Sequence, residues 1–193
     1  MRDLIKMVVV LTAICAGSAL VLSYTNKATK VQREYQLLKY VKGPSILAVL
    51  SDYDNDPIKD AVVVDIGKDQ EGNPVQKTVF PAKKDGKLIA VAYNTMDEKG
   101  YGGAIDIMVG MDNSGDLTGI SIMTSSESPG YGAEASKPAF TDQFKGMYSK
   151  DINLTADGGK IDAVSGATTT SKAVVRALKR AVEIFPAIKK EVS

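Results

Sequence analysis

The sequence predicts an α+β protein, with one N-terminal transmembrane helix followed by a single globular domain of antiparallel strands and packed helices. Residues 7–26 carry no charge, and the short apolar runs beyond them come before the amphipathic helical patterns and do not alternate with them. With 193 residues, the chain is long enough for one domain and an attachment segment.

The uncharged stretch predicts a membrane anchor. About 20 apolar residues cross the hydrocarbon core as a helix, and residues 7–26 meet that length. Arg2 and Lys6 precede the stretch, so the positive-inside bias predicts a cytoplasmic stub over residues 1–6, although lysines also follow it. We therefore expect a single-pass protein of the inner (plasma) membrane, with the bulk of the chain on the extracytoplasmic side. The small residues 16–19 would also suit cleavage of a secretory leader.

The next residues predict a juxtamembrane helix and linker over 27–44, ended by Gly43-Pro44, with the globular domain over 45–193. Short apolar runs between turn residues predict five strands, over 46–50, 61–66, 88–93, 104–109 and 117–123. The turn residues 112–115 predict a hairpin between the last two strands.

Two amphipathic patterns follow the strands. Residues 138–148 space Phe140, Phe144 and Met147 as a helix would. A final helix is predicted from about Ser171. It would bury Val174, Val175, Leu178, Val182 and Phe185, and expose Lys172, Arg176, Lys179, Arg180 and Glu183.

Composition excludes several classes of function. A net charge of +1, with no run of basic residues, gives no basis for binding nucleic acid. One cysteine and no histidine exclude iron–sulfur clusters, structural zinc, the usual haem ligands and a Ser-His-Asp mechanism. If the chain carries electrons, an organic cofactor must hold them.

The segment 165–171, SGATTTS, holds more hydroxyl groups than a helix start needs. Gly166 and Ala167 leave its backbone uncovered, and the free N–H groups at the start of the following helix favour a phosphate. Two interpretations stay open from the residues alone. Thr170 or Ser171 caps the helix and the rest is linker, or one hydroxyl binds phosphate or is esterified by it.

Residues 162–168, DAVSGAT, match the flavinylation motif of a known family, in which an Asp and two variable residues precede Ser or Thr and then Gly-Ala-Thr. The sequence resembles the extracytoplasmic flavin-binding subunits of the Rnf and sodium-pumping NADH:quinone oxidoreductase complexes. The stretch from Gly100 to Met123 and the loop ESPGYG (127–132) also resemble this family, and the chain length suits the Rnf G subunit better. Ser128 and Tyr131 depart from the family's Thr and Leu.

The resemblance implies that Thr168 carries FMN through a phosphoester, made by a separate flavin transferase. It implies that Asp162, Ser165, Gly166, Ala167 and Thr169 form the recognition and cradle positions. The candidates for contacts with the flavin ring are Tyr101, Gly102, Glu127, Ser128, Pro129, Gly130, Tyr131 and Gly132.

The implied function is that of an electron carrier, within a membrane complex that links ferredoxin and NAD to ion translocation. The other subunits of that complex would be its partners, and no catalytic residue or metal site is implied. Two alternatives stay open. In the first, the chain is a C-type flavin subunit of the sodium pump or another flavin reductase. In the second, it is a membrane-tethered domain that binds a phosphate-bearing ligand without redox chemistry.

Overall fold

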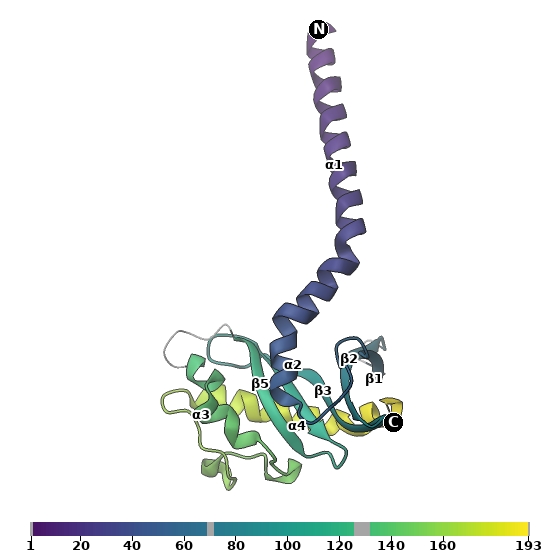
Figure 1. The fold of residues 1–193 in the computed structure, drawn as a ribbon. Helices are drawn as coiled ribbons and strands as arrows, with labels where there is room; N and C mark the ends of the chain where they lie inside the picture. Colours follow the sequence, from purple (N-terminus) through teal and green to yellow (C-terminus); the bar gives the residue numbers. More distant parts are fainter. Residues whose placement is uncertain (1, 69–71, 126–131, 193) are drawn as a thin grey trace. The chain divides into compact units, whose positions relative to one another are not determined.

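The computed structural model describes residues 2–68, 72–125 and 132–192 (Figure 1). The chain divides into two compact units, Met1–Val41 and Lys42–Ser193.

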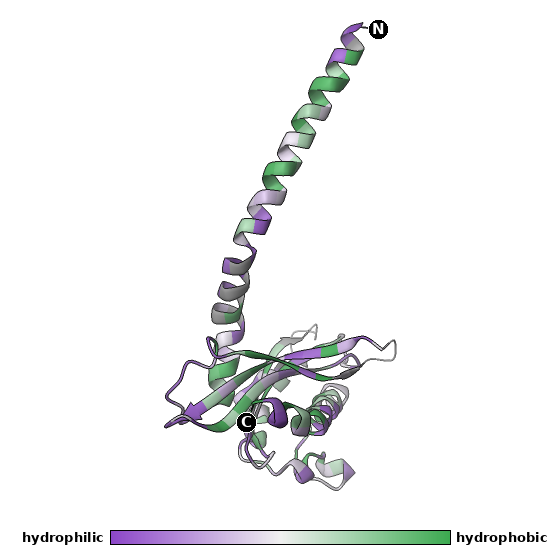
Figure 2. Cartoon of the chain, turned by 90° about the vertical axis from the view of Figure 1, so that its right-hand side faces the viewer, coloured by the Kyte–Doolittle hydropathy of each residue, from purple (hydrophilic) through white to green (hydrophobic). Residues whose placement is uncertain are grey.

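The first unit is one long helix. Helix α1 (Arg2–Leu37) contains the predicted segment 7–26, and its stretch Ile5–Lys30 is long and apolar enough to cross a membrane. Hydrophobic residues lie all around this part of the helix (Figure 2). The predicted N-terminal helix is therefore confirmed, and it extends beyond the uncharged stretch at both ends.

The predicted helix stop at Gly43-Pro44 is wrong. A π-helical turn, Leu38–Lys42, leads into helix α2 (Gly43–Val49), and Pro44 lies in the first turn of α2. A proline is tolerated there because the first N–H groups of a helix have no intrahelical partner. The strand predicted over 46–50 is also wrong, because the chain is helical up to Val49. Ile46 and Val49 are buried residues of α2.

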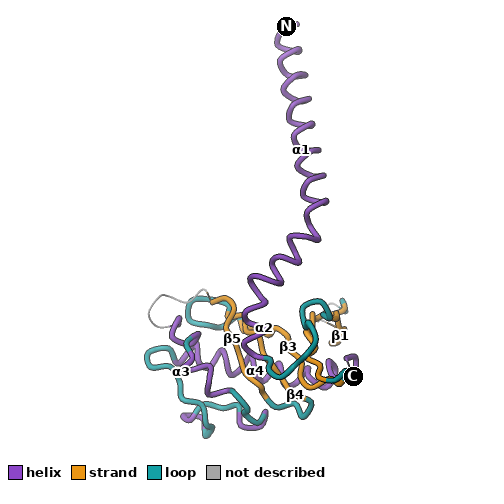
Figure 3. The backbone as a smooth tube through the Cα atoms, in the orientation of Figure 1, coloured by secondary structure: helices purple, strands orange, loops and turns teal. Residues whose placement is uncertain are grey.

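Five described strands form one antiparallel sheet in sequence order, β1-β2-β3-β4-β5 (Figure 3). Their bounds are β1 (Val62–Lys68), β2 (Pro74–Lys84), β3 (Lys87–Asp97), β4 (Ile105–Asp112) and β5 (Leu117–Ser125). The predicted hairpin between β4 and β5 is confirmed. Its turn is held by the Asp112 carboxylate, which accepts the N–H groups of Ser114 and Asp116.

Strand β2 was missed by the sequence prediction, because Pro81 lies within it and a proline argues against a central strand. The pairing of β1 with β2 reaches only as far as Val79, so Pro81 has a strand neighbour on the β3 side alone. The loop before β1 covers this open side, where the Asn55 side chain donates to the Pro81 carbonyl and accepts the Lys83 N–H.

Helix α4 (Thr168–Val192) packs on one face of the sheet and forms the main core there. The paired row Val62, Val79, Tyr93, Val109 and Ile120 crosses all five strands on this face. Tyr93 and Thr95 also donate hydrogen bonds to the carbonyl oxygens of Ala181 and Ala177, one helical turn apart. Strand β3 and α4 are thus joined by polar contacts inside an apolar core.

Helix α2 packs on the opposite face, where the residues on strands β3, β4 and β5 are small. The next paired row reads Phe80, Ala92, Gly110 and Gly119, and the last two lie against Val49. The Thr118 hydroxyl donates to the Val49 carbonyl at 2.5 Å and satisfies the end of α2. The small side chains allow the α2 backbone to approach the sheet closely.

The helix predicted over 138–148 is only partly regular. Helix α3 (Pro138–Thr141) continues as a 3₁₀ turn, Asp142–Phe144, and the chain then turns at Gly146 with φ of 66°. The predicted buried face is correct, because Phe140 and Phe144 are buried and meet edge to face with 5.3 Å between ring centroids. Further 3₁₀ turns lie at Gly132–Ser136, Ser149–Asp151 and Thr155–Asp157.

Candidate functional site

The hydroxyl-rich segment forms the start of α4, which begins at Thr168 and not at about Ser171. The four consecutive hydroxyl residues divide by burial. Thr168 and Thr169 are exposed, whereas Thr170 and Ser171 are buried. Only the first pair is accessible to a phosphate or to a modifying enzyme.

Ser171 has a structural role in holding the segment before the helix. Its hydroxyl accepts the Val164 N–H at 2.9 Å and donates to the Ala167 carbonyl at 3.1 Å. Between these contacts the chain turns at Gly166, whose φ of 76° favours glycine. Residues 162–167, called the arch below, are therefore tied to the first turn of α4.

The other end of the arch is also anchored. Ile161 is fully buried, and its backbone pairs with that of Leu154 in a parallel bridge. Gln143 then holds both backbone groups of Asp162, accepting its N–H at 2.8 Å and donating to its carbonyl at 3.3 Å. Gln143 was missed by the sequence prediction, because its contact lies 19 residues away along the chain.

A hollow of about 230 Å³ lies beside the arch. Its lining comes from the arch and from the segment around α3, namely Glu134, Ala139, Phe140, Gln143, Asp162, Ala163 and Val164. The exposed carboxylate of Asp162 thus lies at the border between this hollow and solvent.

The start of α4 suits an anionic group. The first N–H groups of a helix have no intrahelical acceptor, and the helix dipole places partial positive charge there. The first turn of α4 contains no acidic residue that would balance this charge. The exposed Thr168 hydroxyl at this position is thus accessible to a phosphate-bearing group.

The predicted ring-contact residues are only partly described. Tyr101 is 73% exposed and lies with the exposed Gly102 in the loop between β3 and β4. Gly132 is the first residue of a 3₁₀ turn. The predictions for Glu127, Ser128, Pro129, Gly130 and Tyr131 lie outside the described residues.

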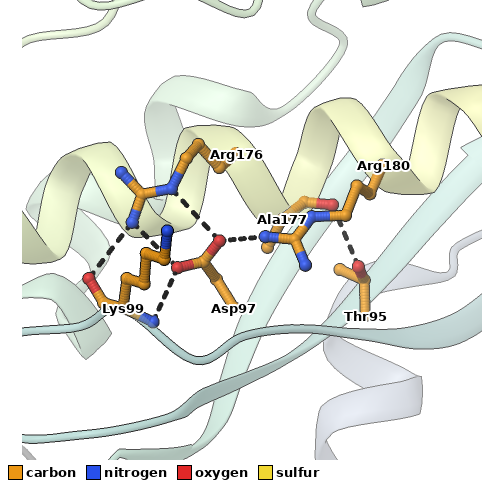
Figure 4. A network of polar contacts seen from close by, with 6 residues as sticks. All are labelled: Thr95, Asp97, Lys99, Arg176, Ala177 and Arg180. Carbon is orange, nitrogen blue, oxygen red and sulfur yellow. Dashed lines mark hydrogen bonds and ion pairs between the residues drawn. The ribbon is translucent and has the colours of Figure 1, made fainter.

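A buried carboxylate joins the loop that carries Tyr101 to α4 (Figure 4). The Asp97 side chain is 1% exposed and accepts two hydrogen bonds from Arg176, at 2.8 and 3.1 Å, and another from Arg180. It also accepts the Lys99 N–H, while Arg176 donates to the Lys99 carbonyl. Arg176 and Arg180 were predicted only as exposed residues, but both pair with Asp97; Arg176 is partly buried and Arg180 is exposed.

The charge of Asp97 is stabilised by these partners. Burial alone would raise the pKa of its carboxyl group, but the Arg176 hydrogen bonds, the Lys99 N–H and the two guanidinium charges outweigh burial and hold the pKa below 3.8. The carboxylate therefore stays ionised at neutral pH and fixes the turn after β3 against α4.

Asp97→Asn is expected to lower the free energy of unfolding by about 1.5 kcal/mol at pH 7, a value reduced because both arginines are partly exposed to solvent. Since the folded-state pKa lies below the unfolded value, this contribution is complete above pH 3.8 and is lost as the pH falls through the folded pKa. Chemical denaturation at neutral and acid pH measures the difference. Glu98→Gln, at the exposed neighbour, should change stability little, and a constant difference down to acid pH would contradict this role of the charge.

Comparison with known proteins identifies the family of this chain. Over 189 residues, covering 96% of this chain and 96% of the relative, the sequence is 31% identical to the G subunit of the ion-translocating oxidoreductase complex of Methanosarcina acetivorans. The chain belongs to this G-subunit family. It is also 28% identical to the G subunit of the Na(+)-translocating ferredoxin:NAD(+) oxidoreductase complex of Acetobacterium woodii, over 96% of this chain and 93% of that protein.

The domain and its fold match as well. The FMN-binding domain family matches residues 100–183, a range that includes the loop with Tyr101, the arch and α4 as far as Glu183. The crystal structure of NqrC from Shewanella oneidensis resembles this structure with a TM-score of 0.53 and 22% identity, over 81% of this chain and 75% of that chain. As a member of the G-subunit family, the chain thus carries an FMN-binding domain after an apolar N-terminal helix.

Proposed function

We propose that this chain is a membrane-anchored electron carrier, with FMN joined through its phosphate to the Thr168 hydroxyl. It would act within an Rnf-type complex that couples electron transfer between ferredoxin and NAD to ion translocation. Its membership of the G-subunit family, the FMN-binding domain and the names of the relatives support this function.

The observation that carries the proposal is the exposure of Thr168 at the start of α4. The DAVSGAT motif ends on this residue, and the arch before it is held at both ends by Gln143 and Ser171. A side chain at this position is open to a transferase and lies beside unsatisfied backbone N–H groups. The resemblance and the geometry therefore favour the same oxygen atom.

The protein's own groups would bind and orient the cofactor. The amides of the first turn of α4 are the natural donors to a phosphate, and Asp162, Ser165, Gly166, Ala167 and Thr169 surround the attachment point along the chain. FMN supplies redox chemistry that a chain without histidine and with a single cysteine lacks. Attachment through the phosphate leaves the flavin ring free of the covalent bond.

Arg2 and Lys6, which precede the uncharged stretch 7–26, favour a cytoplasmic N-terminus and a domain outside the membrane. A covalent bond would then prevent loss of the cofactor where no cytoplasmic pool replenishes it. A separate flavin transferase would make the bond, and other subunits would bind ferredoxin and NAD.

The test is whether flavin stays with the denatured polypeptide. The full chain, produced together with a flavin transferase, should fluoresce as a flavoprotein on a denaturing gel. Its intact mass should exceed that of the bare chain by one FMN less one water. A reversibly bound flavin would wash out on the gel, and an unmodified mass despite an active transferase would overturn covalent attachment.

A further inference from the structure

We propose that Lys172 binds the flavin phosphate on Thr168 and neutralises its charge. This inference rests on the proposed attachment at Thr168. It adds a positioning residue that lies four residues beyond the attachment motif and outside it.

The first reason is the charge balance at the start of α4. Most helix starts gain from acidic residues in the first turn, because the N-terminal end of the helix carries partial positive charge. The first turn of α4 has none, and the next turn adds the ammonium group of Lys172. The last turn, in contrast, carries Lys189 and Lys190, as the dipole favours. The unmodified start of α4 therefore collects positive charge that an anion would balance.

The second reason is the position of Lys172 on α4, four residues after Thr168. Residues four apart lie on the same face of a helix, about 5–6 Å apart between Cβ atoms. Side chains on a helix generally tilt toward its N-terminus, a tendency that favours an approach of Lys172 to Thr168. Both residues are exposed. A phosphate on the Thr168 hydroxyl would thus lie within reach of the ammonium group.

The third reason is that the other cations on this part of α4 already have partners. Arg176 and Arg180 pair with Asp97, and Lys179 donates to the Asn153 side chain at 2.7 Å. Lys172 lines a hollow of about 170 Å³ together with Asp157, yet within the described residues no ion pair or hydrogen bond engages its ammonium group. Lys172 is therefore the cation available to a phosphate at this site.

Opposite effects on the two forms of the protein follow from this arrangement. In the unmodified chain the Lys172 charge opposes the helix dipole, so its removal should raise the melting temperature by about 1 °C. In the flavinylated chain Lys172 faces an anion, so its removal should lower the melting temperature by about 2 °C. A residue with a purely structural role would shift both forms in the same direction.

The experiment compares the full chain in detergent, with and without the transferase during expression. Intact mass first establishes the modification, and circular dichroism then gives the melting temperature of each form. The variants are Lys172→Gln, Lys172→Arg as the rescue, and Lys190→Gln as a matched loss of charge at the other end of α4. The rise in melting temperature on flavinylation should shrink by about 3 °C in Lys172→Gln alone, and high salt should reduce this difference.

Each outcome decides the proposal. A smaller rise in Lys172→Gln, restored in Lys172→Arg, supports it, as does a loss of modification in the glutamine variant only. An equal rise in Lys172→Gln, Lys190→Gln and the wild type overturns the role of Lys172 and leaves attachment at Thr168 intact. A wild-type chain that stays unmodified overturns the proposed attachment and this inference together.

Discussion

Thr168→Ala is expected to lose all covalently bound flavin while the domain keeps its fold. The Thr168 side chain is exposed, so its removal leaves no cavity and no buried polar group without a partner. Intact mass and fluorescence on a denaturing gel should both report the bare chain. Circular dichroism should give a melting temperature within about 2 °C of that of the unmodified wild type.

The neighbouring hydroxyl residues provide the controls. Thr169→Ala removes a hydroxyl at a cradle position but keeps the Thr168 hydroxyl, so the chain should still gain the mass of the flavin, at a slower rate. Ser171→Ala keeps the Thr168 hydroxyl but removes the contacts that tie Val164 and Ala167 to the helix, so it should lower stability by about 1 kcal/mol and slow attachment. Flavin that remains on Thr168→Ala would place the attachment elsewhere.

The sequence alone could locate this segment but could not rank its hydroxyl groups. Any of the residues Thr168, Thr169, Thr170 and Ser171 could cap a helix, and local chemistry does not separate them. The structure separates them by burial, because the core-facing stripe of α4 begins at Thr170. Gln143 and Asp97 were not predictable for a related reason, since each acts on a residue far away in sequence.

Short elements were also harder to predict than long ones. The run 46–50 is apolar and of strand length, and periodicity cannot distinguish a buried strand from a buried helical turn over so few residues. Its helical form as part of α2 depends on the small residues of β4 and β5, which come 60 or more positions later. Helix α1 was predicted from its long uncharged stretch, and α4 was predicted from an amphipathic pattern that repeats over many turns.

Gly110→Ala is expected to lower the free energy of unfolding by about 3 kcal/mol, because the contact between α2 and the sheet cannot admit a methyl group. A Cβ atom at Gly110 would overlap the Val49 carbonyl oxygen and the Thr118 hydroxyl, and it would lie 3.0 Å from the Val49 Cβ. The first of these is backbone, so it cannot move aside as a flexible side chain would. The hydrogen bond from Thr118 to Val49 would be disrupted as well.

Gly119→Ala is the matched control, because Gly119 pairs directly with Gly110 on the same face of the sheet. A Cβ atom there would meet the Val49 Cα at 3.7 Å, an ordinary van der Waals contact, so its stability should stay within about 0.5 kcal/mol of the wild type. Urea denaturation of the full chain in detergent, followed by circular dichroism, measures both variants. Loss of the contact between α2 and the sheet in Gly110→Ala should also speed hydrogen exchange at the backbone amides of Thr118 and Val49. Equal stability of the two variants would contradict the close approach of α2 to the sheet at Gly110.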